Sequence, residues 1–179
     1  MSEGLPQLEM ELPSLDRLPP VEVADGYRLR AYQPADESLW CRLVNECVGG
    51  QWTEEQCRTL MMETPGFEAG DLFFAERDGE VVGTAWALRK QRPEEGPGYL
   101  HMVAVFAEHR GHRLGRALVL AALHRFREVG YRSAVLQTDD WRLAAIKVYA
   151  GLGFRPKMTH ESHEGRWREV YQRSRSGHL

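Results

Sequence analysis

The segment that most constrains the fold of this chain runs from Tyr99 to Leu123. Its first part is rich in residues that favour extended backbone: Leu100, Met102, Val103, Val105 and Phe106. After a short loop, apolar residues recur three or four positions apart, as on one face of a helix: Leu118, Ala122, Phe126 and Val129. Gly130 then follows the last of them, where a glycine commonly ends a helix. The pattern therefore predicts a strand, a tight loop and a helix.

The loop at residues 109–116 has the properties of an anion-binding site. Its glycines allow backbone conformations that a side chain would penalise, and they let the main chain approach a ligand closely. The first amide groups of the following helix have no partner within it, and the helix dipole favours an anion there. Six arginines and one acid lie between His109 and Arg132, although the chain has a net charge of −3. A local basic excess in an acidic chain indicates an anionic ligand rather than general affinity for nucleic acid.

Two common phosphate-binding motifs are absent from this segment. No Gly-Lys-Ser or Gly-Lys-Thr follows the loop, which argues against a nucleotide-hydrolysing P-loop. The Gly-x-Gly-x-x-Gly pattern of dinucleotide-binding folds is missing as well. Taken alone, the segment is also compatible with an ordinary strand–helix connection that carries surface arginines.

The segment resembles motif A of the GCN5-related N-acetyltransferase (GNAT) superfamily, which reads Arg/Gln-x-x-Gly-x-Gly/Ala. Arg110 stands at the first position and Gly115 at the last, whereas Arg113 replaces the usual glycine at the fourth. In this family the motif holds the diphosphate of acyl-coenzyme A. The resemblance implies that the cofactor contacts are made by Arg110, Gly111, His112, Arg113, Leu114, Gly115 and Arg116.

A second segment is similar to motif B of the same family, Asn-x-x-Ala-x-x-x-Tyr followed by Leu-Gly-Phe. The matching residues are Ala145, Tyr149, Leu152, Gly153 and Phe154. Arg142 occupies the asparagine position, and the resemblance implies that it also contacts the cofactor. Both motifs stand in the usual order with a strand between them, and the similarity extends over about residues 27–172.

The resemblance implies an α/β fold of the GNAT acyl-CoA N-acyltransferase type. We expect a mixed, mostly antiparallel sheet of six to seven strands, splayed in the middle, with about four helices. Residues 26–179 would form the acetyltransferase domain, and residues 1–25, which are rich in proline and acids, a flexible arm. No secretory leader or membrane-spanning run is visible, and the three cysteines have no metal-ligand spacing. We therefore expect a cytoplasmic protein without membrane contact and without a metal.

Other elements can be placed by local signals. Residues 27–32 alternate as a strand does, and helices are expected after Pro34 and after Thr53, which begins a capping box with Gln56. Asp78-Gly79 predicts a tight hairpin. Residues 133–138 form a further expected strand, Asp139-Asp140 the cap of the next helix, and residues 167–172 the last strand.

The resemblance also implies roles in catalysis. Acyl-coenzyme A would lie along the strand at Met102, Val103 and Val105, and a main-chain N–H at or near Val103 would stabilise the oxyanion. Tyr149 is the expected general acid for the departing thiolate, with a packing role as the alternative. His101 is the expected general base. A structural or solvent-facing histidine, or a water relay to a distant carboxylate, is its alternative.

We therefore expect an N-acetyltransferase with acetyl-CoA as co-substrate, in which an amine attacks the thioester directly in a ternary complex. The partners would be acyl-CoA and an amine-bearing acceptor, and the protein would be a monomer or homodimer. An alternative is a non-catalytic sensor or scaffold module that binds acyl-CoA. A third hypothesis, RNA binding through the arginines, is disfavoured by the acidic net charge. The sequence leaves the acceptor open.

Overall fold

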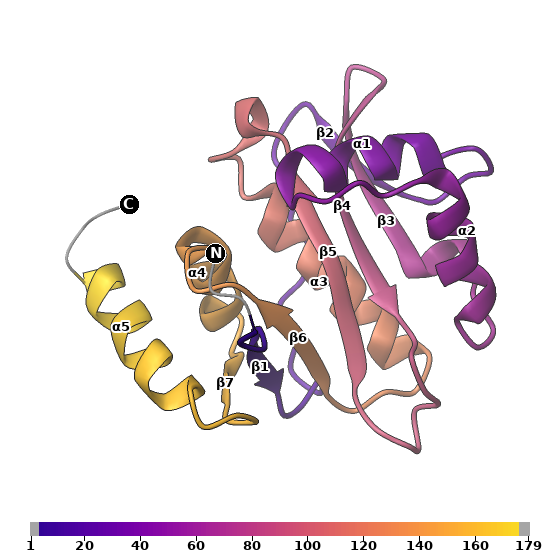
Figure 1. The fold of residues 1–179 in the computed structure, drawn as a ribbon. Coiled ribbons are helices and arrows are strands. Elements are labelled where there is room, and N and C mark those ends of the chain that lie inside the picture. The colour runs from indigo at the N-terminus through magenta and orange to yellow at the C-terminus, as the bar shows by residue number, and fades with distance from the viewer. Residues whose placement is uncertain (1–3, 176–179) are drawn as a thin grey trace. The chain divides into compact units, whose positions relative to one another are not determined.

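The computed structural model describes residues 4–175, and its residues form two compact units (Figure 1). The larger unit comprises residues 14–134, and the smaller unit comprises residues 4–13 together with residues 135–175. Each unit is described by itself.

The larger unit is built on four strands and three α-helices. The strands lie in the order β2-β3-β4-β5, and each neighbouring pair is antiparallel. Their bounds are β2 Tyr27–Ala31, β3 Leu72–Arg77, β4 Glu80–Leu88 and β5 Gly98–Val105. The helices are α1 Glu37–Cys47, α2 Glu54–Glu63 and α3 Leu114–Glu128, with short 3-10 turns at Ala69–Asp71 and Ala107–His109. In Figure 1, α1 lies in front of the strands and α3 behind them.

The smaller unit contains three strands and two helices. The strands lie in the order β6-β1-β7, and β1 pairs antiparallel with β7, Met10 being opposite Pro156. Their bounds are β1 Leu8–Leu12, β6 Ala134–Thr138, whose first residue falls in the larger unit, and β7 Arg155–Lys157. The helices are α4 Leu143–Gly151 and α5 His163–Arg175.

The predicted mixed α/β fold with mostly antiparallel strands is confirmed. Residues 4–175 contain seven strands and five α-helices, one helix more than expected. The additional helix is α5, which covers residues 167–172 where a last strand was expected, so that prediction was wrong. Trp167 and Val170 are both buried and lie three positions apart, a spacing that serves a helix.

Part of the expected flexible arm is also ordered. Leu8, Met10 and Leu12 are buried and alternate with partly exposed residues, which is the period of a strand with one face covered. The prediction of a flexible arm was therefore wrong for residues 8–12. The division into an arm and one domain is otherwise a prediction.

Several local predictions are confirmed. Asp78 and Gly79 both have positive φ, 52° and 85°, as a two-residue hairpin loop of this kind requires. Thr53 and Gln56 form the reciprocal capping box at the start of α2. The cap expected at Asp139-Asp140 was wrong, because α4 begins later, at Leu143.

The two aspartates before α4 instead make ion pairs within the smaller unit. Asp139 accepts from the Nε of Arg142 at 2.8 Å, and Asp140 accepts from the Nε of Arg166 at 2.8 Å. Both carboxylates are thus paired with arginines, and no side chain caps the start of α4. Arg142 itself becomes the residue that precedes the first helical position.

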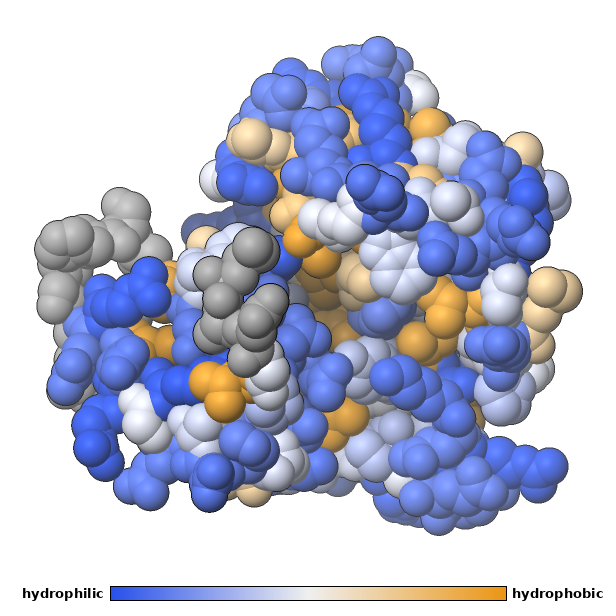
Figure 2. Space-filling model, viewed as in Figure 1, coloured by the Kyte–Doolittle hydropathy of each residue, from blue (hydrophilic) through white to orange (hydrophobic). Residues whose placement is uncertain are grey.

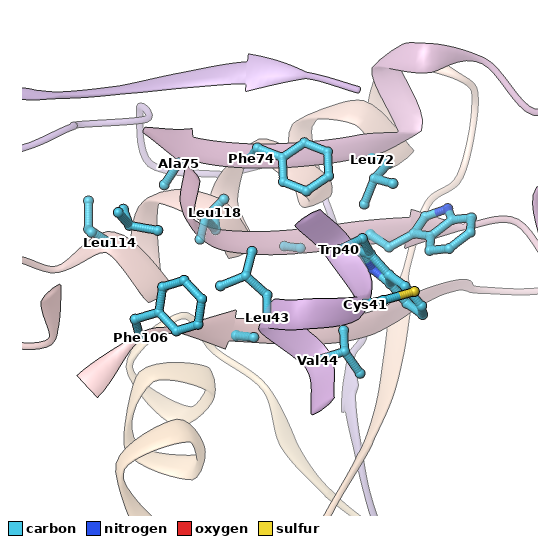
Figure 3. Packing of buried hydrophobic residues seen from close by; sticks show 14 of the residues in the cluster. Trp40, Cys41, Leu43, Val44, Leu72, Phe74, Ala75, Phe106, Leu114 and Leu118 are labelled. Carbon is cyan, nitrogen blue, oxygen red and sulfur yellow. The ribbon is translucent and has the colours of Figure 1, made fainter. Parts of the chain in front are cut away.

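The core of the larger unit holds both ends of the basic loop, residues 109–116, in place. Trp40, Leu43 and Val44 on one face of α1 are at most 1% exposed and pack toward the strands (Figure 3). Phe106, shortly before the loop, and Leu114, the first residue of α3, belong to the same buried cluster. Burial of the two flanking side chains therefore anchors the loop, while its middle residues stay exposed.

A buried carboxylate fixes the far end of α3. Asp71 is fully buried and accepts from Arg89 at 2.6 Å and from the Nε of Arg125 at 2.9 Å. Its Oδ2 also accepts from the amide of Glu68 at 2.8 Å. Arg125 lies in the last turn of α3, so this network ties the C-terminal end of the helix to the turn before β3.

Candidate functional site

Strand β5 carries a bulge next to the basic loop. Opposite β4, Thr84 pairs with Ala104 and Trp86 with His101, so Met102 and Val103 together face the single residue Ala85. Met102 has φ of +45°, which is rare for a residue with a side chain. A bulge takes backbone groups out of the regular ladder and is common beside active sites. Nothing in the sequence signals it, because no glycine marks the position.

The loop after β5 adopts two left-handed conformations in succession. Gly111 has φ of +86°, and Arg113, the residue immediately before α3, has φ of +57°. The second position is where motif A usually has glycine. An L-residue in this conformation costs about 1–2 kcal/mol, so the usual glycine has a backbone reason, and Arg113 retains the conformation despite that cost.

The amide groups of the loop are open. Within residues 4–175, none of the main-chain N–H groups of residues 111–116 donates to an acceptor of the chain. The first helical bond of this region is donated by Ala117 to the carbonyl of Arg113 at 3.1 Å. No side chain caps the start of α3. Open amides at a helix N-terminus bind an anion readily.

The arginine side chains of the loop are also available to a ligand. Arg110 donates only a long hydrogen bond, 3.4 Å, to the carbonyl of Val105. In the described part of the chain, Arg113 and Arg116 form no ion pair and no side-chain hydrogen bond. Arg125, further along the same helix, by comparison forms ion pairs with Glu68 and Asp71.

Gly115 leaves space at the second position of α3. A Cβ built there would meet no atom within 4 Å. The larger unit thus brings together, within one continuous segment, the open amides, the unpaired guanidinium groups and a side-chain-free position. All seven loop residues that the sequence assigned to the cofactor lie in this segment.

His101 lies in an aromatic environment at the bulge. Its ring is next to those of Trp52, Trp86 and Tyr99, with centroid distances of 6.4, 6.2 and 5.6 Å. Burial, and to a smaller extent the charge of Lys90, lowers the pKa of His101 to about 4. The imidazole is therefore neutral at pH 7. Its Nε2 is buried and has no hydrogen-bond partner among the described residues.

The remaining predicted residues, Tyr149 and Arg142, belong to the smaller unit. Tyr149 is buried near the end of α4, with its ring 5.9 Å from that of Phe154. Burial raises the pKa of Tyr149 to about 12, an effect that the positive charge of Arg142 partly opposes. Arg142 is paired with Asp139, and its guanidinium lies 4.1 Å from the ring centroid of the exposed Trp141.

The cysteines are not activated nucleophiles. Cys41 and Cys57 are buried, and burial raises the pKa of Cys57 to about 12. Burial also raises the pKa values of Cys41 and Cys47. A reactive thiol needs a lowered pKa, so none of the three has the electrostatics of an acyl carrier.

Few large apolar side chains are exposed among the residues that the structure describes. The face drawn in Figure 2 is mostly hydrophilic, with separate apolar areas. Among the exposed large apolar side chains of the described residues, Met62 and Trp141 have the largest exposed fractions, 78% and 62%. No helix within residues 4–175 combines the length and apolar character needed to cross a bilayer.

A bulged strand followed by a basic loop and an uncapped helix defines the class: an α/β protein with open main-chain amides at the start of a helix. The family model described as "Acetyltransferase (GNAT) family" matches residues 35–154. The chain therefore belongs to the GNAT acetyltransferase family.

Individual relatives agree with this assignment. A mycothiol acetyltransferase from Thermobispora bispora is 36% identical over 154 residues, covering 81% of this chain and 52% of the relative. The corresponding protein of Thermomonospora curvata is also 36% identical, with 82% and 50% covered. The chain thus spans about half the length of the curated relatives it matches.

Solved structures show the same fold. A GCN5-related N-acetyltransferase from Sphaerobacter thermophilus superposes with a TM-score of 0.71 at 24% identity, covering 86% of this chain and 50% of that one. An acetyltransferase from Salmonella typhimurium, solved with acetyl-CoA, gives a TM-score of 0.61 at 19% identity, with 73% and 80% covered.

Proposed function

We propose that this chain is an N-acetyltransferase that transfers the acetyl group of acetyl-CoA to an amine by direct attack. The observation that carries the proposal is the loop at residues 111–116, whose amides are open and whose flanking guanidinium groups are unpaired. Family membership supports acetyl-CoA as the donor.

The loop would bind the diphosphate of the cofactor. The N–H groups of Gly111 to Arg116 would donate to phosphate oxygens, assisted by the helix dipole. Arg110, Arg113 and Arg116 would add charge-assisted hydrogen bonds, which are stronger than those between neutral groups.

The bulged part of β5 would hold the acyl-pantetheine arm. Main-chain groups of Met102, Val103 and Val105 would pair with its amides, as an added strand pairs with a sheet edge. The oxygen of the thioester becomes negative in the tetrahedral intermediate, and the Val103 N–H would stabilise it there.

Tyr149 would protonate the departing thiolate. A phenol with a pKa of about 12 is protonated at every physiological pH, so its proton is available for donation. The charge of Arg142 favours the phenolate that forms on donation.

His101 would act on the acceptor side. A neutral imidazole with a buried, unpartnered Nε2 can accept a hydrogen bond from the attacking amine. A pKa of about 4 makes it a weak base, so we propose that it orients the amine and receives the proton only transiently, before water removes it.

The acceptor is proposed only as an amine. The relatives named mycothiol acetyltransferases suggest their acceptor as one candidate for this chain, although the chain spans only half of their length. The oligomeric state, a monomer or a homodimer, stays a prediction.

The test is release of free thiol from acetyl-CoA in the presence of a panel of amines. The panel would contain small amines, aminoglycosides, peptide N-termini and the acceptor of the mycothiol acetyltransferases, and calorimetry would measure acetyl-CoA binding in parallel. Binding together with amine-dependent thiol release is expected. Binding without release for every acceptor would favour the sensor module, and absence of binding would refute the proposal.

A further inference from the structure

A small polar cluster connects the basic loop to strands β2 and β3, and its residues have no part in the function proposed above. Its centre is Tyr27, the first residue of β2, which is 8% exposed. Arg77, opposite Tyr27 on β3, donates from Nη1 to the tyrosine oxygen at 3.1 Å. The tyrosine hydroxyl lies 3.1 Å from Nδ1 of His109, in the 3-10 turn that opens the loop.

The donors and acceptors in this chain of contacts follow from the arginine. A guanidinium can only donate, so the Tyr27 oxygen accepts from Arg77, and the tyrosine hydrogen is left to donate. The Tyr27 hydroxyl then donates to Nδ1 of His109, and the ring hydrogen of His109 lies on Nε2. A tyrosine hydroxyl that already accepts from a cation is a stronger donor, because hydrogen bonds in a chain polarise one another.

The second histidine of the loop, His112, packs against the same tyrosine. The ring of His112 lies 5.2 Å from that of Tyr27, and the ring of His109 lies 5.8 Å from it in an edge-on arrangement. His112 Nδ1 also lies 3.3 Å from the carbonyl of His109, so this nitrogen carries a hydrogen and donates it. Both histidines are thereby attached to one side chain of the sheet.

This attachment matters because the loop is conformationally costly. Gly111 and Arg113 both have positive φ, and the second carries the cost of a side chain in that region. A free loop would sample other conformations in which its amides do not converge. Fixing residues 109 and 112 from outside keeps the intervening backbone in the binding conformation before the ligand arrives, which lowers the entropic cost of binding.

We propose that Tyr27 is a positioning residue for the diphosphate: with Arg77 it holds His109 and His112, and so pre-organises the amides of the anion-binding loop. The inference rests on the proposed function and extends it to a residue more than 80 positions away in the sequence. Tyr27 touches neither donor nor acceptor in this role and acts only through the loop.

The test uses Tyr27→Phe, which removes the hydroxyl and keeps the ring that packs against both histidines. Calorimetry would measure Kd for three probes: CoA, inorganic pyrophosphate and pantetheine, which lacks the diphosphate. We expect Kd to rise about 3- to 10-fold for CoA and pyrophosphate, from the loss of one hydrogen bond, and to stay unchanged for pantetheine. Tyr131→Phe is the matched control, because it removes a tyrosine hydrogen bond to the carbonyl of Gln91 elsewhere in the same unit.

Two variants of His109 separate positioning from packing. His109→Asn places an acceptor near the former Nδ1 and should retain most of the affinity for pyrophosphate, whereas His109→Leu should lose as much as Tyr27→Phe. Equal weakening of all three probes, or the same Kd for CoA in the Tyr27 and Tyr131 variants, would overturn the inference while the proposed function stands. If the wild type itself does not bind CoA, the proposed function fails, and the inference fails with it.

Discussion

Replacement of Gly115 by glutamate separates ligand binding from folding at one position. The position is the second residue of α3, and an added Cβ meets no atom of the chain within 4 Å. Replacing glycine by an ordinary helix-forming residue stabilises a helix by up to about 1 kcal/mol. A carboxylate in the first turn adds about 0.3–1 kcal/mol through the helix dipole. The variant should therefore unfold at the same temperature as the wild type or at a higher one.

The effect on binding has the opposite sign. At a separation of about 5 Å and an effective dielectric constant of about 20, two like unit charges repel by about 3 kcal/mol. This energy corresponds to an increase in Kd of about 100-fold, before any loss of contact between the phosphates and the amides. Calorimetric titration with CoA gives the Kd, and thermal unfolding of the same samples gives the stability.

The matched control is Gly165→Glu, which introduces the same side chain into the first turn of α5. A Cβ there also meets no atom within 4 Å, and the position is exposed. We expect the control to bind CoA as the wild type does. An unchanged Kd for Gly115→Glu in a folded protein would show that the loop is not where the diphosphate binds, and the reasoning from open amides would be refuted.

Three further predictions concern other parts of the molecule. Tyr149→Phe should lower kcat by about 100-fold at saturating acetyl-CoA with little change in Kd for CoA, and an unchanged kcat would remove Tyr149 from the acid role. Because burial lowers the pKa of His101 from 6.5 to about 4, the folded state binds fewer protons than the unfolded state between these values. The contribution of His101 to the free energy of unfolding is complete above pH 6.5 and is lost as the pH falls toward 4. Urea titrations should show that the free energy of unfolding falls by about 2 kcal/mol between pH 7.5 and pH 5, and this fall should be absent in His101→Phe. Asp71→Asn leaves Arg89 and Arg125 without their shared buried carboxylate and should lower the free energy of unfolding by about 3–5 kcal/mol, whereas a loss below 1 kcal/mol would contradict the assigned network.

Much of the fold could be predicted because its signals are local. The hairpin at Asp78-Gly79 is set by two residues with positive φ, and the start of α2 by the reciprocal bonds of Thr53 and Gln56. Elements whose stability depends on distant partners were missed. Strand β1 forms opposite β7, about 145 residues away, and nothing near Met10 indicates that partner.

The sequence indicates which residues could form the candidate site, but not their backbone conformation or their electrostatics. Motif A identified the loop, yet the left-handed conformation of Arg113 and the bulge at Met102 depend on tertiary structure and leave no mark in the sequence. The low pKa of His101 has the same origin. It arises from burial of the ring beside Trp52, on the loop before α2, and Trp86, on the neighbouring strand β4, which reach His101 only in the folded chain.

The two ends of helix α3 offer separate targets for protein engineering. Its last turn is secured through Arg125 to the buried Asp71, and Phe126 is fully buried, so contacts remote from positions 113, 115 and 116 help to hold the helix in the larger unit. A library of variants at positions 113, 115 and 116 could thus be screened for altered donor preference, with most members still folding well enough to be assayed.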